Sequence, residues 1–289
     1  MTTNITQNQL CNARPIGVLD SGVGGLSVLK HIHTLLPHEN LIYFADSKHA
    51  PYGNKTPKQI EQRVFAAAKF LLTHGAKALV IACNTATAAA AAKLRDKYAF
   101  LDIPIIGMEP AVKPAAAVTK NGIIGVLATS GTLKSAQFAA LLESYGRNVQ
   151  VVTQACVGLV EQIELGELGS PKTLALIAQY TQPLLDEHAD TIVLGCTHYP
   201  FVKAAIQSAV GAHIHLIDTG AAVAKQLQNK LAERGLLALD EKKASVFIWT
   251  NSAEPNSELV INGLWAGEAK VKRFQLSIKA NDAQPLHPL

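Results

Sequence analysis

The sequence contains one strand–turn–helix pattern twice, and each copy carries a cysteine in its turn. The first copy runs from Lys77 to Ala92, where an apolar run leads to Cys83 and then to an alanine-rich stretch. The second copy runs from Asp190 to Ala205 and places Cys196 at the same point. In an open parallel sheet such turns lie at the carboxyl ends of the strands, where ligands bind. The pattern therefore predicts an α/β fold with two thiols at equivalent ligand-binding positions.

Further similarity between the two parts of the chain indicates an internal repeat. Residues 122–132 resemble residues 16–25, and a chain of 289 residues is long enough for two domains. We therefore predict two similar α/β domains with mainly parallel sheets, related by a pseudo-two-fold axis, with the active site in the cleft between them. The first domain is expected to comprise residues 1–108 plus a returning segment, 219–289, and the second residues 109–218.

Hydrophobic patterning predicts the positions of the main elements. The returning segment is expected to add two strands around a helix near residues 258–265. The other expected strands include 16–19, 41–45, 78–81, 103–107, 149–153 and 191–194, and the expected helices include 26–36, 57–72 and one that ends near Tyr98.

Composition and charge exclude several classes of protein. The net charge is +4, but Lys and Arg are scattered and the densest group, residues 270–273, is short and interrupted. Because nucleic-acid binding needs basic residues clustered on one face, no nucleic-acid partner is expected. The apolar stretches are too short to span a membrane, and the first residues do not form a secretory signal. We therefore expect no membrane association and a cytoplasmic location.

Cysteine spacing gives no sign of disulfides or of a zinc site. Cys11, Cys83, Cys156 and Cys196 are widely separated and form no CxxC pair. Cys196 and His198 lack two further ligands at recognisable spacing, so no metal is expected. A reduced setting is the default for such a chain, and Cys11 and Cys156 are interpreted as structural or incidental.

The glycine-rich turn after the first expected strand is a weak nucleotide-binding signal. Gly22 and Gly24 begin like a GxGxxG motif, but Ser27 stands where the last glycine should be. Asp20 also occupies the turn, and a carboxylate disfavours a bound phosphate. We interpret the segment as a tight turn that brings Asp20 and backbone amides close to a small ligand; a helix cap is the alternative.

Two matched thiols on opposite sides of one cleft suit the inversion of a carbon centre. One thiolate removes a proton from the carbon, and the opposite thiol delivers a proton to the other face. Asp20 is expected to act as a proton relay near Cys83, and His198 to assist Cys196 with Glu161 as support. Helix capping or packing is the alternative role for His198. A thiol at a helix amino terminus is also expected to favour its thiolate.

Several motifs resemble those of the glutamate racemases, in the same order and over most of the chain. The resemblance implies cofactor-independent interconversion of L- and D-glutamate, which supplies D-glutamate for peptidoglycan, and usually a homodimer. It implies that Cys83 and Cys196 are the two acid–base residues. The motifs are residues 19–26, 51–53, 82–86, 128–132 and 194–200. The residues expected to line the substrate site are Asp20, Ser21, Pro51, Tyr52, Gly53, Asn84, Thr85, Thr129, Thr132, Thr197 and His198.

Three alternatives stay open at the level of sequence. An aspartate or hydantoin racemase would share the chemistry but differ in substrate. A two-lobed amino-acid binding protein would close two similar halves on a ligand without turning it over. A hydrolase with Cys196 as nucleophile and His198 as base would leave Cys83 dispensable.

Overall fold

The computed structural model describes residues 12–239 and 244–276, so Cys11 lies outside the described residues. Within these ranges the strands form two sheets, of six and four strands, and every pairing is parallel. The first sheet has the order β10-β9-β2-β1-β3-β4 and the second β6-β5-β7-β8. The strands are β1 (Ile16–Asp20), β2 (Leu41–Ala45), β3 (Ala78–Ile81), β4 (Ile105–Ile106), β5 (Ile123–Ala128), β6 (Gln150–Ala155), β7 (Thr191–Leu194), β8 (His215–Ile217), β9 (Val246–Thr250) and β10 (Lys270–Arg273).

The strand order shows the internal repeat directly. Strands β2-β1-β3-β4 of the first sheet correspond, in order and direction, to β6-β5-β7-β8 of the second. The predicted fold class, two similar α/β domains with parallel sheets, is therefore confirmed. Because β3 and β7 occupy equivalent places, the residues that follow them, including the two cysteines, also occupy equivalent places.

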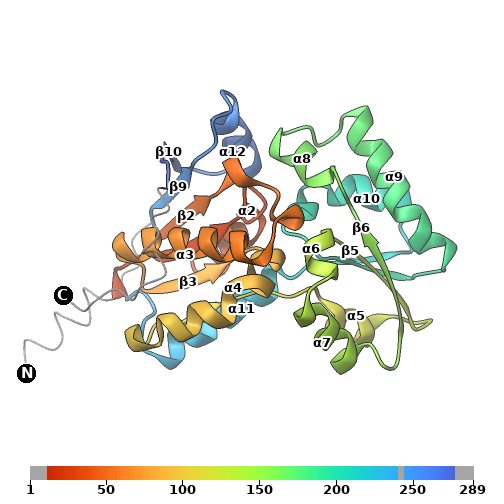
Figure 1. The fold of residues 1–289 in the computed structure, drawn as a ribbon, viewed down its shortest axis with the longest axis horizontal. Coiled ribbons are helices and arrows are strands. Elements are labelled where there is room, and N and C mark those ends of the chain that lie inside the picture. Colours follow the sequence, from red (N-terminus) through yellow and green to blue (C-terminus); the bar gives the residue numbers. More distant parts are fainter. Residues whose placement is uncertain (1–11, 240–243, 277–289) are drawn as a thin grey trace, which may run out of the picture.

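Helices cover both faces of each sheet, as the nearly continuous apolar strands require. In the first half, α2, α11 and α12 pack on one face and α3 and α4 on the other (Figure 1). In the second half, α8, α9 and α10 cover one face and α5 and α7 the other. The helices are α2 (Leu26–Leu35), α3 (Pro57–Thr73), α4 (Asn84–Lys97), α5 (Val112–Val118), α6 (Ser130–Leu133), α7 (Ala136–Tyr145), α8 (Leu159–Glu164), α9 (Pro171–Asp186), α10 (Lys203–Val210), α11 (Gly220–Glu233) and α12 (Ser257–Trp265).

Local sequence accounts for where the elements near the site begin and end. Thr56 and Gln59 form a reciprocal capping box at the start of α3, directly after the 51–53 segment. The strand expected at 103–107 is shorter than predicted and covers only Ile105–Ile106. Pro104 cannot donate a ladder hydrogen bond, which limits pairing at this edge of the sheet.

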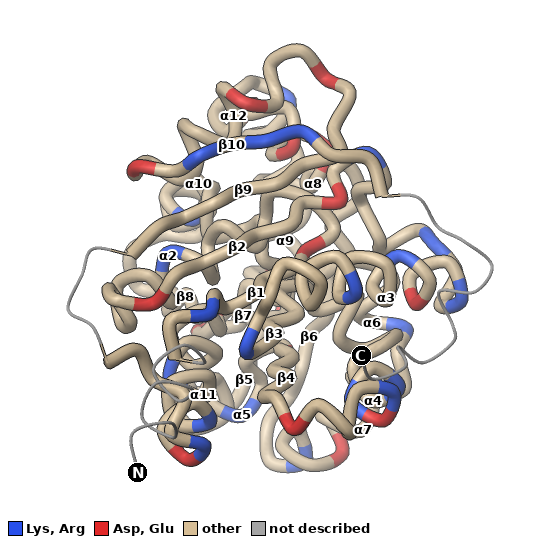
Figure 2. The backbone as a smooth tube through the Cα atoms, turned by 90° about the vertical axis from the view of Figure 1, so that its left-hand side faces the viewer, with Lys and Arg blue, Asp and Glu red and all other residues tan. Residues whose placement is uncertain are grey.

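The returning C-terminal segment joins the first sheet. β9 pairs in parallel with β2, and β10 pairs with β9, so the basic residues 270–273 form an edge strand. Figure 2 shows this basic strand along the sheet edge, where Lys272 lies over the ring of Trp249 at 5.0 Å. Charged residues at an edge oppose pairing with another chain. The residue boundaries assigned above to the two domains stay a prediction.

Candidate active site

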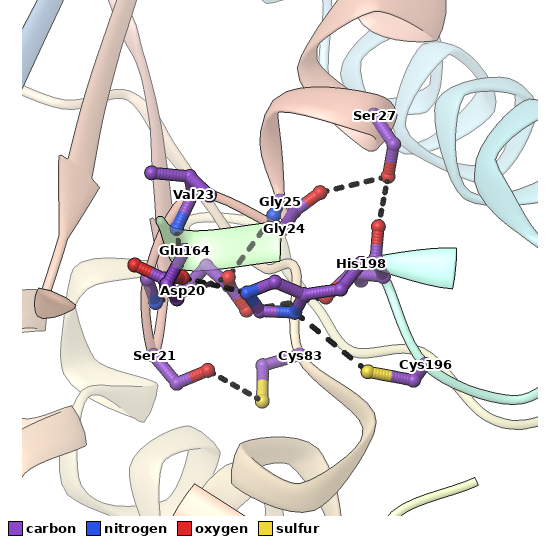
Figure 3. A network of polar contacts seen from close by, with 12 residues as sticks. Asp20, Ser21, Val23, Gly24, Gly25, Ser27, Cys83, Glu164, Cys196 and His198 are labelled. Carbon is purple, nitrogen blue, oxygen red and sulfur yellow. Dashed lines mark hydrogen bonds and ion pairs between the residues drawn. The ribbon is translucent and has the colours of Figure 1, made fainter. Parts of the chain in front are cut away.

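Cys83 and Cys196 follow the equivalent strands β3 and β7 and line the same small cavity between the two halves. Both side chains are buried, at 6% and 7% exposed. Figure 3 shows each sulfur with its polar neighbour: Ser21 for Cys83 and His198 for Cys196. The two halves of the chain therefore contribute one thiol each to a common space.

Cys83 is the N-cap residue of α4, but its surroundings favour the neutral thiol. The amide of Ala86 donates to its sulfur at 3.4 Å, and Cys83 donates to Ser21 Oγ at 3.7 Å. Burial, and then the charge of Asp20, raise the pKa of Cys83 far above its ordinary value. The amide of Ala86 lowers the pKa of Cys83, as expected of a helix amino terminus, but desolvation outweighs this single amide contact.

Cys196 is the first member of a chain of polar contacts that crosses between the halves. Its sulfur lies 3.7 Å from His198 Nδ1, and His198 Nε2 lies 2.6 Å from Glu164 Oε1. The same carboxylate oxygen accepts from the amide of Val23, in the first half, at 2.7 Å. Burial alone would lower the pKa of His198, but its bonds to Cys196 and Glu164 raise it well above the ordinary value. The contacts of His198 therefore favour its imidazolium form.

The carboxylate that supports His198 is Glu164, which corrects the assignment of Glu161 to that role. Both residues lie on α8, and Glu161 instead lines a larger cavity at the surface. Residues three apart share a helix face, so the sequence alone gives no means of choosing between the two. The contacts of Glu164 with His198 and Val23, which both come from distant segments of the chain, identify Glu164 as the supporting carboxylate.

Asp20 lies behind the cavity rather than on its wall. Its Oδ2 accepts from the amides of Gly22 and Gly25 at 3.1 and 3.0 Å, and Thr197 donates to Oδ1 at 3.5 Å. Burial raises the pKa of Asp20 to about 6, although His198 and the amide of Gly25 act in the opposite direction. Its role as a proton relay stays a prediction.

Asp20→Asn is expected to stabilise the fold in a pH-dependent way. The pKa of Asp20 is raised from 3.8 to about 6, so ionisation costs the folded state about 3 kcal/mol above pH 6. That cost is absent below about pH 4, where the carboxyl is protonated in both the folded and the unfolded chain. Urea unfolding at several pH values should show the variant's advantage over wild type growing between these limits. An advantage that does not change with pH would contradict the raised pKa.

The glycines at positions 22 and 24 are explained by close approach between the halves. A Cβ at Gly22 would lie 1.8 Å from Glu164 Oε1, and one at Gly24 would lie 2.2 Å from His198 Nδ1. Only glycine lets the turn pass so near these side chains. The glycine-rich turn therefore makes room for Glu164 and His198. Its predicted role, to bring Asp20 and backbone amides close to a small ligand, stays a prediction.

Most residues expected to line the substrate site lie on the wall of the small cavity. Asn84 is notable because both its side-chain polar atoms are buried and have no partner within the described structure. Buried polar atoms are normally paired, so Asn84 is suited to bind a polar ligand. Gly195, from the 194–200 motif, also lines the cavity, as does Val160, which belongs to none of the motifs. The expected residues on the wall are Ser21, Pro51, Tyr52, Gly53, Asn84, Thr85, Thr129, Thr132, Thr197 and His198.

A larger cavity of about 690 Å³ adjoins the small one. The two share wall residues, including Gly53, Thr85 and Thr129. Lys55 and Lys134, one from each half, line the larger cavity and give it a cationic rim, partly offset by Glu161.

Cys156 also lines the larger cavity, and its thiol is buried. Burial raises the pKa of Cys156 to about 12, which makes it a poor acid or base near neutral pH. Its interpretation as a structural residue stays a prediction.

Among residues 12–239 and 244–276, no cluster of three or more His, Cys, Asp or Glu side chains is placed to hold a metal ion. The same residues include no helix of the length and apolarity needed to cross a bilayer.

The chain has two similar parallel-sheet halves, and each contributes one thiol to a shared cavity. Comparison with known families identifies the class of enzymes to which this arrangement belongs. Residues 16–227 match the family described as Asp/Glu/Hydantoin racemase. The chain belongs to this family and is therefore an enzyme, an isomerase of the racemase type.

Within the family, the chain is similar to glutamate racemases. It is 55% identical to the glutamate racemase of Pseudomonas entomophila (strain L48), over 91% of this chain and 98% of that protein. The glutamate racemase of Escherichia coli, solved with L-glutamate and the activator UDP-MurNAc-ala, has 32% identity and a TM-score of 0.81, covering 91% and 99% of the two chains. The enzyme of Francisella tularensis subsp. tularensis SCHU S4, solved with D-glutamate, has 30% identity and a TM-score of 0.78, covering 92% and 98%. The resemblance to glutamate racemases noted from the motifs is confirmed.

Proposed function

We propose that this enzyme interconverts L- and D-glutamate by proton transfer at Cα between two cysteines, without a cofactor. The observation that carries the proposal is the shared cavity of Cys83 and Cys196, reached from opposite halves at equivalent strand ends. Support for glutamate comes from the similar glutamate racemases and from the complexes of two of them with L- and D-glutamate.

The proposed reaction moves one proton off Cα and another onto it. In one direction Cys196, as a thiolate bonded to the His198 imidazolium, takes the Cα proton and becomes a thiol. The electron pair of the broken C–H bond stays on the substrate and is spread into the α-carboxylate. Cys83 then donates its thiol proton to the opposite face of Cα and becomes the thiolate. The reverse direction uses the same groups with their roles exchanged.

The surroundings of the two sulfurs suit this exchange of roles. Burial keeps Cys83 as a thiol in the free enzyme, which is the proton donor that the first direction needs. His198, held as a cation by Glu164, balances negative charge on Cys196. The unpaired amide of Asn84 and the threonines Thr85, Thr129 and Thr132, whose hydroxyls lie within 3.1 Å of one another, offer hydrogen bonds to the carboxylates.

Substrate entry requires the two halves to move apart. The cavity between the cysteines has a volume of about 10 Å³, which holds about one water. Glutamate is much larger, so the wall residues contributed by each half must separate to admit it. We propose that it enters through the larger cavity, where Lys55 and Lys134 attract its carboxylates.

The resemblance also supports proposals about biological context. We infer that the product D-glutamate is used for peptidoglycan, and that the enzyme acts in the cytoplasm as a homodimer.

The proposed function is tested by incubation with L-glutamate in D2O without added cofactor. Optical rotation should fall to zero while deuterium enters Cα, because each proton taken by a cysteine exchanges with solvent. Aspartate and a hydantoin, treated in parallel, should retain their rotation. Racemisation of either one, with glutamate unchanged, would overturn the assignment of glutamate as substrate.

A further inference from the structure

Asp46 directly follows strand β2, and its fully buried carboxylate is bound by four side chains. Burial alone would raise the pKa of Asp46, but hydrogen bonds from His49 and Arg63 lower it, so the group is a carboxylate at neutral pH. The contacts are Arg63 Nε at 2.7 Å, Arg63 Nη2, Tyr52 Oη at 2.6 Å, His49 Nδ1 at 3.1 Å and Asn251 Nδ2.

One of these partners belongs to the wall of the active site. Tyr52 is 3% exposed and begins the short turn Tyr52–Asn54 that lines the cavity. The next residue, Gly53, lies against the second half: a Cβ there would be 2.7 Å from Thr129 Cβ. Gly131 also lies close to the turn, since a Cβ on it would lie 3.0 Å from Gly53 O. A small displacement of the turn would therefore change its fit against Thr129 and Gly131.

A second partner connects this turn to the returning C-terminal segment. Asn251 follows β9, and the pairing of β9 with β2 places it beside Asp46. Its amide nitrogen donates to Asp46, and its amide oxygen accepts from the backbone of Lys48 at 3.0 Å. Asn251, from the segment that follows the second half, therefore binds both Asp46 and Lys48, which lie just before residues 51–53 in the chain.

We propose that Asp46 and Asn251 are positioning residues that hold residues 51–53 (the substrate turn) in the geometry needed to bind the substrate. Neither residue lines the cavity between the cysteines; both act through Tyr52 and the backbone that follows it. Hydrogen-bonded groups behind a site commonly fix the orientation of the groups that touch the ligand. The proposal rests on the proposed racemisation of glutamate for its kinetic test, and one further measurement is independent of it.

The opposite end of β2 supplies a matched control. Glu39, just before β2, forms a buried ion pair with Lys77, at 2.6 Å, and the two side chains are 2% and 1% exposed. Glu39 also accepts from the amide of Ala238 at 2.7 Å. This pair is as buried as that of Asp46 and Arg63, but it lies at the amino ends of the strands, away from the site.

The experiment compares Asp46→Asn, Tyr52→Phe and Asn251→Ala with Glu39→Gln. We expect KM for glutamate to rise about tenfold in the first three, with kcat within about threefold of wild type, because a misplaced turn weakens ground-state and transition-state binding alike. Glu39→Gln should lower the melting temperature but leave KM within about twofold. Tyr52→Phe and Asn251→Ala should be non-additive when combined, because both act through Asp46.

Hydrogen exchange of the backbone amides of residues 47–56 provides the independent readout, measured without substrate. We expect faster exchange in Asp46→Asn and Asn251→Ala than in wild type, and no change in Glu39→Gln. If Asp46→Asn does not fold, Tyr52→Phe and Asn251→Ala, which each remove one hydrogen bond to Asp46, still decide the question. Unchanged KM and unchanged exchange in those variants would overturn the proposal. A wild-type enzyme inactive on glutamate would overturn the proposed function, while the exchange data still test the positioning role.

Discussion

Replacing Cys83 or Cys196 with serine is expected to lower kcat/KM for glutamate racemisation by roughly 10³-fold or more. A serine hydroxyl fits the space of a thiol but is a far weaker acid, so it neither holds nor returns a proton at the required rate. Because the two enantiomers have equal free energy, kcat/KM must fall equally in both directions in each variant. The measurement is optical rotation starting from each pure enantiomer.

Deuterium exchange separates two-base chemistry from one-base chemistry in these same variants. Each single-cysteine enzyme retains one sulfur and should exchange the Cα proton of only the enantiomer that faces it. Cys83→Ser and Cys196→Ser are therefore expected to exchange opposite enantiomers, each without inversion. Substantial racemisation by either variant would contradict the proposed mechanism. The Cys156→Ser variant is the matched control and should keep near-wild-type activity.

Glu164→Gln is expected to lower kcat by roughly 10²-fold, a loss comparable to that of an acid–base group. The carboxylate raises the pKa of His198, and its loss lowers that pKa again, so the imidazolium is lost at a lower pH. The alkaline limb of the pH–rate profile should therefore move to lower pH in the variant. Kinetics between pH 6 and 10 would measure both effects.

The control for this prediction is Glu161→Gln, one helical turn away on α8. Glu161 lines the larger cavity and does not contact His198. We expect kcat to stay within about twofold of wild type and the alkaline limb to stay in place. A larger loss of kcat in Glu161→Gln than in Glu164→Gln would restore the role that the sequence first assigned to Glu161.

Local sequence predicted the elements and the two thiols because these depend on short-range patterns. Apolar runs before Cys83 and Cys196, followed by helix formers, are sufficient to define equivalent strand ends. Motif resemblance supplied most of the residues on the cavity wall, because they lie within a few positions of those strand ends. The exception is Val160, which lies on α8 outside the motifs.

The sequence by itself determined the α/β class, the repeat and the pair of thiols, since periodicity and spacing are written along the chain. Only the tertiary structure decided which charges act on those thiols. Glu164 rather than Glu161 reaches His198, and Asp46 reaches Asn251, through contacts between residues far apart in sequence. The pKa of Cys83 was likewise decided by burial and by Asp20 rather than by its own helix. The physical reason is that desolvation and Coulomb energies depend on distances in space, which no local pattern encodes.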